Sequence, residues 1–261
     1  MDKQRVLFKD LGIIDYKAAW DYQEELVKAN VAIKAEIRKS NQSEFNTQYP
    51  TFNIQHSAYD VHHSPFTIHH SPTTHHLLFC EHLPVYTLGK SGSMKNVLLS
   101  EQEMDEREIE FFKTNRGGDI TFHGLQQVVG YPVLDLEKFY TDIGKYLRDL
   151  EELIILTIDE YGIKGKRSKG ETGVWIEPGA KGKERKICAM GIRCSRWITM
   201  HGFALNVNTD LSYFKNIIPC GIQNKLVTSM EKELGSKVDF EEVKQKLKSN
   251  FEKVFHVQII S

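Results

Sequence analysis

The sequence predicts an α+β fold in which helices pack against a mixed or antiparallel β-sheet. Three segments place apolar side chains at helical spacing, and the segments between them are short, apolar and bounded by turn residues, as strands are. Long helices separated by antiparallel-looking strands favour a layer of helices on a sheet. Because the chain has 261 residues and no long-period repeat, we expect a single domain over residues 1–261.

The helices are predicted from apolar stripes and capping residues. Asp15 can cap the first helix, which carries apolar side chains over residues 22–37. The second follows Asp135 and shows its stripe over residues 139–161, with Gly162 at the position of a C-terminal cap. The third helix is predicted over residues 240–254. The predicted strands lie, in chain order, at residues 77–80, 85–88, 127–134, 173–176, 186–194, 198–207 and 256–260.

The composition excludes several classes of protein. Apolar residues make up 40% of the chain and charged residues 26%, and the 34 basic and 35 acidic side chains nearly cancel, which argues against nucleic-acid or anionic-membrane binding. The chain has no run of 18 apolar residues, so no membrane span is predicted, and it has no apolar N-terminal segment that would predict a signal peptide. The four cysteines form no CxxC pair and predict free thiols in a reducing compartment. We therefore expect a cytoplasmic protein.

Residues 41–76 differ from the rest of the chain. They contain seven of the 11 histidines, including two copies of His-His-Ser-Pro at His62 and His69, and Glu44 and Asp60 are their only charged groups. A transition-metal site is one interpretation, because imidazole is the commonest ligand for such metals. The adjacent histidines lack the helical i, i+4 spacing, and no cysteine or acidic cluster accompanies them. We predict a loop-like, His-rich insertion and no metal.

Two segments carry residue types suited to chemistry. The run from Arg116 to Gly124 has two adjacent glycines, which let a turn approach a ligand closely, and it is surrounded by hydrogen-bond donors. Alone it is weak evidence, because glycine pairs also mark ordinary turns. On a strand, Lys186 would share a face with Cys188 and Met190, where its ammonium either extends to solvent or is partly desolvated beside a ligand.

Cys220 differs from the other cysteines. Cys80, Cys188 and Cys194 lie within strand-like apolar runs, which is typical of buried thiols, whereas Cys220 lies between Pro and Gly in a turn that would present its thiol at a surface or cleft. His201, on the preceding predicted strand, fits a buried core position better than a catalytic one. Cys220 is therefore the cysteine that we expect to have a function.

The chain resembles the octanoyltransferase family, also called lipoate–protein ligase B, within the biotin/lipoate ligase-like fold group. The resemblance lies in several blocks that occur in the family's order and cover most of the chain outside residues 41–76. The blocks are Leu11-Gly12 with Asp15-Tyr16 and Trp20 to Gln23, then Glu81 to Gly89, Arg116 to Gly124, Tyr131 to Leu136, Lys186 to Ile192, His201 to Asn208, and Pro219 to Gly221 through Thr228 to Met230. Leu125 and Gln126 replace the family's usual Pro-Gly, which changes the turn after the glycine loop.

The resemblance implies an acyltransferase that uses no cofactor. It would transfer an octanoyl group from acyl carrier protein to the lysine of lipoyl domains, those of 2-oxoacid dehydrogenases and of the glycine cleavage H protein, as the first step of protein lipoylation. Cys220 would be the nucleophile that forms an acyl thioester, and Lys186 would lower the pKa of that thiol and act as general acid and base. The implied substrate-binding residues are Arg116, Gly117, Gly118, Asp119, Ile120, Thr121, Phe122, His123, Ala189, Met190, Gly191, Gly202, Phe203 and Ala204.

Two further observations bear on binding. The small residues Gly191, Gly202 and Ala204 would leave room for an eight-carbon chain. Eight basic and three acidic residues lie between Lys164 and Lys186, which indicates either a solvated loop or a docking surface for an acidic carrier protein. The alternatives are an ATP-dependent lipoate or biotin ligase, which would need no cysteine at position 220, and a non-catalytic module that binds an acylated protein.

Overall fold

The computed structural model describes residues 3–48, 72–218 and 226–260, without the side chains of residues 41–48. Its large sheet is mixed, which agrees with the predicted fold class. Parallel pairs join β12, β1 and β2, and the pairs from β2 through to β7 are antiparallel. The strands lie in the order β12 (Val257–Ile260), β1 (Gln4–Ile13), β2 (His75–Glu81), β6 (Gln127–Val133), β10 (Ile198–Asn206), β9 (Arg185–Ser195), β8 (Val174–Ile176) and β7 (Gly165–Lys166), with β11 (Leu226–Val227) also paired to β9.

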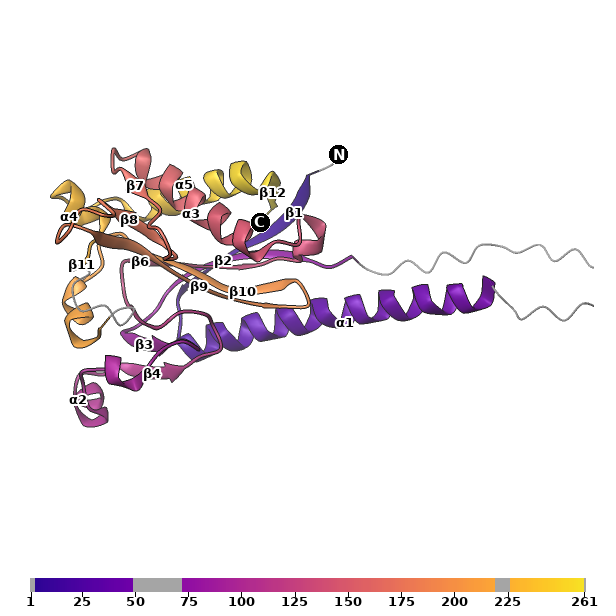
Figure 1. Cartoon of the computed structure of the whole chain (residues 1–261), viewed down its shortest axis with the longest axis horizontal. Coiled ribbons are helices and arrows are strands. Elements are labelled where there is room, and N and C mark those ends of the chain that lie inside the picture. The colour runs from indigo at the N-terminus through magenta and orange to yellow at the C-terminus, as the bar shows by residue number, and fades with distance from the viewer. Residues whose placement is uncertain (1–2, 49–71, 219–225, 261) are drawn as a thin grey trace, which may run out of the picture.

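A smaller sheet lies beside the large one. Its strand order is β4 (Glu110–Lys113), β3 (Val85–Leu88) and β5 (Ile120–His123), and α2 (Glu101–Glu106) lies next to it (Figure 1). Because β5 leads through a short turn into β6, the glycine loop just before β5 is held close to the centre of the large sheet. This position brings the loop into the candidate site described below.

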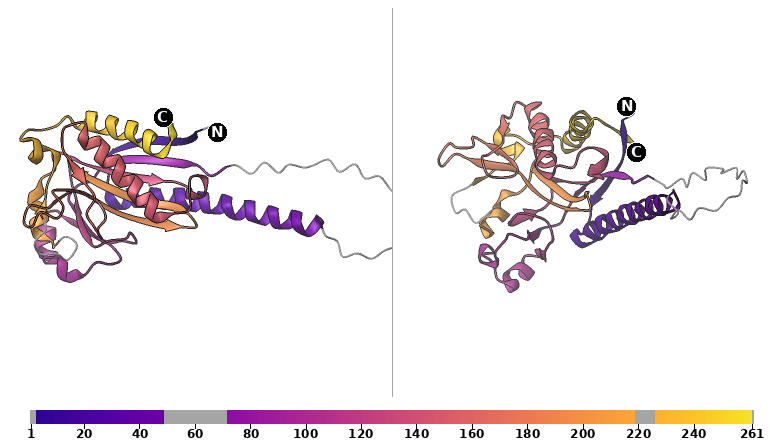
Figure 2. Two further views of the ribbon diagram at one scale, coloured as in Figure 1. Left: turned by 45° about the horizontal axis from the view of Figure 1, so that its top comes forward. Right: turned by 45° about the vertical axis from the view of Figure 1, so that its right-hand side comes forward.

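Helices cover both faces of the large sheet. Helix α1 (Tyr16–Gln48) runs along one face, and α3 (Ile143–Asp159) and α5 (Phe240–Phe255) pack on the other (Figures 1 and 2). The alternation along β2 (residues 75–81) explains this arrangement. Leu77 and Phe79 belong to the apolar cluster with α3 and α5, whereas Leu78 and Cys80 belong to the cluster under α1.

The second helix begins later than the sequence predicted. Asp135 caps only the short 3₁₀ turn Leu136–Lys138, where its side chain accepts from the Glu137 N–H. Asp142 is the N-cap of α3, and its carboxylate accepts from the Lys145 N–H at 2.9 Å. Both Asp135 and Asp142 precede the apolar stripe and could cap the helix. Because the Asp135 side chain makes contacts elsewhere in the fold, Asp142 is the cap of α3.

The boundaries of the predicted insertion also differ. Helix α1 continues through residues 41–48, because no glycine or proline interrupts it before Pro50, and β2 already begins at His75. The remainder of the predicted insertion, residues 49–71, lies outside the described residues. The short helix α4 (Met230–Leu234) and the C-terminal α5 complete the fold. In the described part of the chain, every helix is too short or too polar to cross a membrane.

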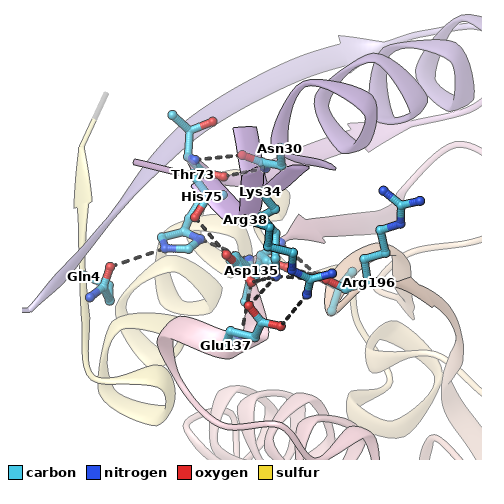
Figure 3. A network of polar contacts seen from close by, with 12 residues as sticks. Gln4, Asn30, Lys34, Arg38, Thr73, His75, Asp135, Glu137 and Arg196 are labelled. Carbon is cyan, nitrogen blue, oxygen red and sulfur yellow. Dashed lines mark hydrogen bonds and ion pairs between the residues drawn. The ribbon is translucent and has the colours of Figure 1, made fainter. Parts of the chain in front are cut away.

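A buried polar network fixes α1 to the start of β2, to the segment after β6 and to the turn between β9 and β10 (Figure 3). The Lys34 ammonium donates to Asp135 Oδ1 at 2.7 Å and to the Arg196 carbonyl at 2.9 Å, and Thr73 Oγ1 donates to Asp135 Oδ2 at 2.9 Å. The Asn30 side chain exchanges two hydrogen bonds with the Thr74 backbone, each 2.8 Å. The contacts tie the middle of the helix to the start of β2.

Candidate active site

A pocket opens between the two sheets, on the face of the large sheet that α1 covers. It encloses about 930 Å³ outside the protein atoms, part of which is open to solvent. Its apolar wall includes Val129 from β6 and Ala204 from β10, and Tyr16 lines it from the start of α1. Met190 and Phe203 also border the pocket, but their side chains pack in the core on the other face of the sheet.

Most of the predicted binding residues line this pocket, although they come from distant parts of the chain. Phe122 does not line it, because its ring stacks on Tyr213 with the centroids 4.5 Å apart in a separate core under the small sheet. Gly117 is also absent from the lining. The predicted residues that do line the pocket are Arg116, Gly118, Asp119, Ile120, Thr121, His123, Lys186, Ala189, Met190, Gly191, Gly202, Phe203 and Ala204.

Arg116 fixes the glycine loop from inside. Its guanidinium, 7% exposed, donates to Thr87 Oγ1 at 2.9 Å and to the Thr87 carbonyl, and it also donates to the Gly117 carbonyl at 3.0 Å. The Gly117 N–H donates to the Ile192 carbonyl at 2.9 Å. The loop is therefore tied to both sheets, and the Gly117 amide is engaged within the fold and does not face a ligand.

Lys186 lines the pocket for a reason that the strand pattern did not reveal. Val174 pairs with Cys188 and Trp175 pairs with Lys186, so Ile187 is an extra residue, a β-bulge that breaks the alternation of β9. The predicted shared face is therefore wrong: Cys188 packs into the core, and Lys186 lines the pocket. The Lys186 ammonium lies 4.6 Å from the centroid of the Trp175 ring, a cation–π contact.

Two of the predicted small residues, Gly191 and Gly202, line the pocket and also stand where neighbouring backbone leaves no room for a Cβ. A Cβ at Gly191 would lie 2.6 Å from the Gly117 carbonyl oxygen, and a Cβ at Gly202 would overlap the carbonyl oxygen of Gly130. These glycines admit neighbouring backbone and so let the loop and strands approach each other. Ala204, by contrast, lines the pocket with its methyl group in the cluster that contains Val129.

Burial keeps three polar side chains of the pocket, those of His201, His123 and Tyr16, neutral. Burial lowers the pKa of His201 to about 3, with the cations of Arg116 and Arg193 acting in the same direction. Burial also lowers the pKa of His123 well below its ordinary value and raises the pKa of Tyr16 to about 12. At neutral pH these three groups are therefore uncharged, which suits a wall that contacts an apolar ligand.

The second layer of the wall is also hydrogen-bonded and neutral. The Tyr131 hydroxyl lies 2.8 Å from His82 Nε2, and His82 Nδ1 lies 2.8 Å from the Ile14 carbonyl. Because a carbonyl only accepts, Nδ1 carries the proton and Nε2 accepts from Tyr131. Burial lowers the pKa of His82 to about 4, so this tautomer persists at neutral pH.

The sequence reasoning did not single out several lining residues. His201 was expected in the core, and it is buried, yet it also lines the pocket. Tyr16, Gln127 and Asn206 gave no signal apart from their places beside or within the resembling blocks. The lining residues that were not predicted are Tyr16, Gln127, Val129, Tyr131, Thr172, Trp175, His201, Asn206, Phe214, Leu226 and Val227.

Some of the residues predicted to carry chemistry lie outside the described residues. Cys220 lies outside the described residues, as do the histidines between residues 56 and 70. The structure describes two histidines of the His-rich segment, and both are hydrogen-bonded. His75 Nδ1 accepts from the Asp135 N–H at 3.2 Å, and His76 Nε2 lies 3.0 Å from Thr74 Oγ1.

Comparison with known proteins identifies the class that this fold and pocket define. Residues 55–252 match the family described as the lipoyl protein ligase A/B catalytic domain. The chain is 51% identical to the octanoyltransferase of Christiangramia forsetii over 260 residues, covering 99% of both chains. It is 50% identical to the octanoyltransferase of Flavobacterium psychrophilum over 256 residues, covering 98% of both. The chain belongs to the lipoyl protein ligase A/B catalytic domain family.

Solved structures agree on the fold. Lipoate-protein ligase A bound with ATP matches with a TM-score of 0.60 at 14% identity, covering all of this chain and 90% of that one. A bipartite lipoate protein ligase from Thermoplasma acidophilum matches with a TM-score of 0.57 at 16% identity, covering all of this chain and 88% of that one. The predicted family and lipoate-ligase fold are thereby confirmed, and with the octanoyltransferase relatives so is the enzyme class, an acyltransferase of protein lipoylation.

Proposed function

We propose that the pocket binds an octanoyl chain and that Cys220 and Lys186 transfer it from acyl carrier protein to the lysine of a lipoyl domain. The observation that carries the proposal is the position of Lys186. Its ammonium lies at an apolar pocket whose other walls are the glycine loop and β10, in a chain half identical to octanoyltransferases. The predicted partners, 2-oxoacid dehydrogenase lipoyl domains and the glycine cleavage H protein, remain part of this proposal.

The reaction would have two balanced steps. The Cys220 thiolate attacks the thioester carbonyl of the donor, and the carrier thiolate leaves and takes a proton from the Lys186 ammonium. The amine of the acceptor lysine then attacks the Cys220 thioester, the neutral Lys186 amine takes up the proton that the attacking nitrogen loses, and the Cys220 thiolate is released. A nearby ammonium favours a thiolate over a thiol, and each unit by which it lowers the thiol pKa corresponds to about 1.4 kcal/mol.

The pocket would supply most of the affinity for the acyl chain. Burial of a methylene contributes roughly 0.8 kcal/mol, so several methylenes against Val129 and Ala204 would contribute a few kcal/mol. The neutral histidines and tyrosines behind this wall add no charge that would have to be desolvated. This part of the wall suits a medium-length saturated chain.

The carrier protein would meet the basic segment between residues 164 and 186, which lies beside the pocket. Three of its cations are already paired within the fold: Lys164 with Asp159, Arg167 with Glu151 and Glu152, and Arg185 with Glu177 and Glu233. Within the described residues, Lys166, Lys169, Lys181 and Lys183 have no ion pair, and these lysines would contact an acidic carrier. Their contribution would be mainly to the association rate.

Intact-protein mass spectrometry tests the proposal directly. After mixing with octanoyl-acyl carrier protein, the wild-type chain should gain one octanoyl mass, located on the Cys220 peptide, and should lose it when lipoyl domain is added. The variant Cys220→Ala should gain none. Cys194→Ala, which alters a half-buried cysteine distant in sequence from Cys220, is the matched control and should be acylated normally. Full transfer by Cys220→Ala would disprove the thioester mechanism.

The two alternatives predict different results. An ATP-dependent ligase would label the lipoyl domain from free octanoate and ATP, with or without Cys220. A non-catalytic binding module would form no covalent adduct and would not label the lipoyl domain. The cytoplasmic location, the single-domain organisation and the absence of a metal remain predictions from the sequence.

A further inference from the structure

A continuous chain of hydrogen bonds crosses the back of the pocket from the glycine loop to the backbone of Lys186. It begins at Arg116, whose guanidinium donates to Thr87 Oγ1 through Nε at 3.3 Å and through its second terminal nitrogen at 2.9 Å. With both of these bonds accepted, the Thr87 hydroxyl can donate its own proton. The neighbouring acceptor is His123 Nε2, 3.3 Å away.

The direction of each later bond follows from its neighbours. The Gln127 amide nitrogen donates to the Asn206 Oδ1 at 2.8 Å and to the Phe122 carbonyl at 3.2 Å, so Gln127 Oε1 is the acceptor for His123 Nδ1 at 2.9 Å. His123 therefore carries its proton on Nδ1, and Nε2 accepts from Thr87. The direction of each side-chain hydrogen bond is therefore fixed, because flipping either amide or moving the His123 proton would place two donors or two acceptors together.

The chain ends on β11 and β9. The Asn206 amide nitrogen donates to the Thr228 carbonyl at 2.9 Å, and the Thr228 N–H donates to the Lys186 carbonyl at 3.0 Å. Val227 pairs with Lys186 in the parallel β11–β9 ladder. The last two bonds hold the backbone of Lys186 against β10.

This hydrogen-bond network joins the two sheets and is almost completely buried. Thr87 and His123 belong to the small sheet, and Gln127 and Asn206 belong to the large one. Thr87 and Thr228 are 0% exposed, Gln127 is 1% and Asn206 is 3%. Buried amides of this kind have few alternative partners, so losing one link leaves the next group unsatisfied and free to reorient. Burial and the Arg116 charge both keep His123 neutral, which the network requires.

We propose that Gln127 and Asn206 are positioning residues, which set the Lys186 amine relative to the glycine loop through this network. The inference rests on the proposed role of Lys186. In this inference, Gln127 and Asn206 are needed for the reaction but do not themselves react with the substrate. Their substitution should therefore change the reactivity that Lys186 controls, besides lowering stability.

The test is the pH dependence of Cys220 alkylation by iodoacetamide, followed on the peptide by mass spectrometry, together with steady-state transfer. Lys186→Met sets the full effect and should move the midpoint of the alkylation profile to higher pH by one unit or more. Gln127→Met and Asn206→Leu should each move it in the same direction by about half a unit. They should also lower kcat about tenfold, with a smaller change in KM.

The matched control is Asn250→Leu. Asn250 is another buried asparagine, 2% exposed, whose amide donates to Thr157 and Glu160 at the α3–α5 interface, on the opposite face of the large sheet from the pocket. It should lower the melting temperature and leave the alkylation profile unchanged. If the Gln127 and Asn206 variants behave like Asn250→Leu, their role is only structural and the inference is wrong.

The remaining outcomes also distinguish failure of this inference from failure of the proposed function. If Lys186→Met leaves the profile unchanged while wild-type Cys220 is acylated, the role of Lys186 fails and the network has nothing to position. If Cys220 is never acylated, the proposed function fails, which the alkylation profile alone would not reveal. Should Gln127→Met not fold, Gln127→Asn keeps the amide but is too short to bridge His123 and Asn206, and it should give the same shift.

Discussion

The ammonium of Lys34 lies 2.7 Å from Asp135 Oδ1, and both side chains are buried, 6% and 1% exposed. Lys34 belongs to α1 and Asp135 to the segment after β6, so this ion pair connects the helix to the sheet through the fold (Figure 3). Glu137 lies 2.9 Å from the same ammonium at the exposed edge of the network. The pair stabilises α1 over the face that forms the pocket.

We expect Lys34→Met to be strongly destabilising. The variant leaves the Asp135 carboxylate buried without its cation, and breaking a buried pair from one side costs about 3–5 kcal/mol. Asp135→Asn in the same background should recover part of that loss, because a neutral amide of the same shape needs no cation. Urea unfolding of the two variants measures this. A double variant less stable than Lys34→Met would show that the carboxylate is satisfied by Thr73 and the backbone alone.

Acid should destabilise this protein through its buried histidines. Burial lowers the pKa of His75 and His82 to about 4 and that of His201 to about 3. The unfolded chain, with histidine pKa values of about 6.5, takes up protons first. Their contribution to stability is therefore complete above pH 6.5 or so and is lost as the pH falls toward the folded pKa values, by up to about 1.4 kcal/mol per pH unit for each histidine.

His201→Asn tests this pH dependence at one position. Asparagine tolerates the positive φ of 59° at residue 201, so the variant removes a titrating group without a new backbone strain. The slope of unfolding free energy between pH 6.5 and 5 should become shallower. His256→Asn, at a φ of 53° on an exposed helix end, is the control and should leave the slope as it is. An unchanged slope in His201→Asn would contradict the assignment.

The sequence was sufficient for the elements whose apolar pattern is local. The helices from Asp15 and Phe240 and most of the central strands follow from that pattern. Strand β1 (residues 4–13) did not, because it carries the charged residues Arg5, Lys9 and Asp10 and shows no apolar alternation, and Val6 is its only fully buried side chain. Its partners, β2 and β12, are far away in the sequence, so no local signal marks the pairing.

The candidate site shows the same division. Arg116, His123 and Lys186 could be selected by residue type and by resemblance to the family. The bulge at Ile187 turns Lys186 toward the pocket. It depends on the pairing of β9 with β8, which the local sequence does not predict. Gln127 and Asn206 are ordinary amides until the fold places them 2.8 Å apart.

Substitutions at two glycines should affect stability and activity differently. Gly202→Ala would force β10 away from the Gly130 carbonyl in the centre of the sheet, and we expect a loss of about 1–3 kcal/mol in unfolding free energy. Gly191→Ala would push against the Gly117 carbonyl, 2.6 Å from the new Cβ, and so displace the glycine loop. Its transfer rate should fall by tenfold or more with a smaller effect on stability.

The control for these glycines is Gly162→Ala at the end of α3. Gly162 has a φ of 79° and open space around it, so the substitution introduces backbone strain of about 1 kcal/mol and no steric clash near the pocket. It should lower the melting temperature and leave transfer at the wild-type rate. A Gly191→Ala variant with full activity would show that the loop position is not needed for transfer.

Ala204 should limit the length of the acyl chain. Its methyl group, 3% exposed, lies in the pocket wall with Val129 and Tyr131, so a leucine there would occupy space that the proposed octanoyl chain needs. One methylene in an apolar pocket is worth about 1–3 kcal/mol of discrimination. We expect Ala204→Leu to lower the ratio of kcat/KM for octanoyl over hexanoyl donors by tenfold or more. Ala32→Leu, on the exposed face of α1, should keep the wild-type ratio. If Ala204→Leu slows both donors equally, Ala204 does not contact the distal part of the chain, and the chain runs along another wall of the pocket.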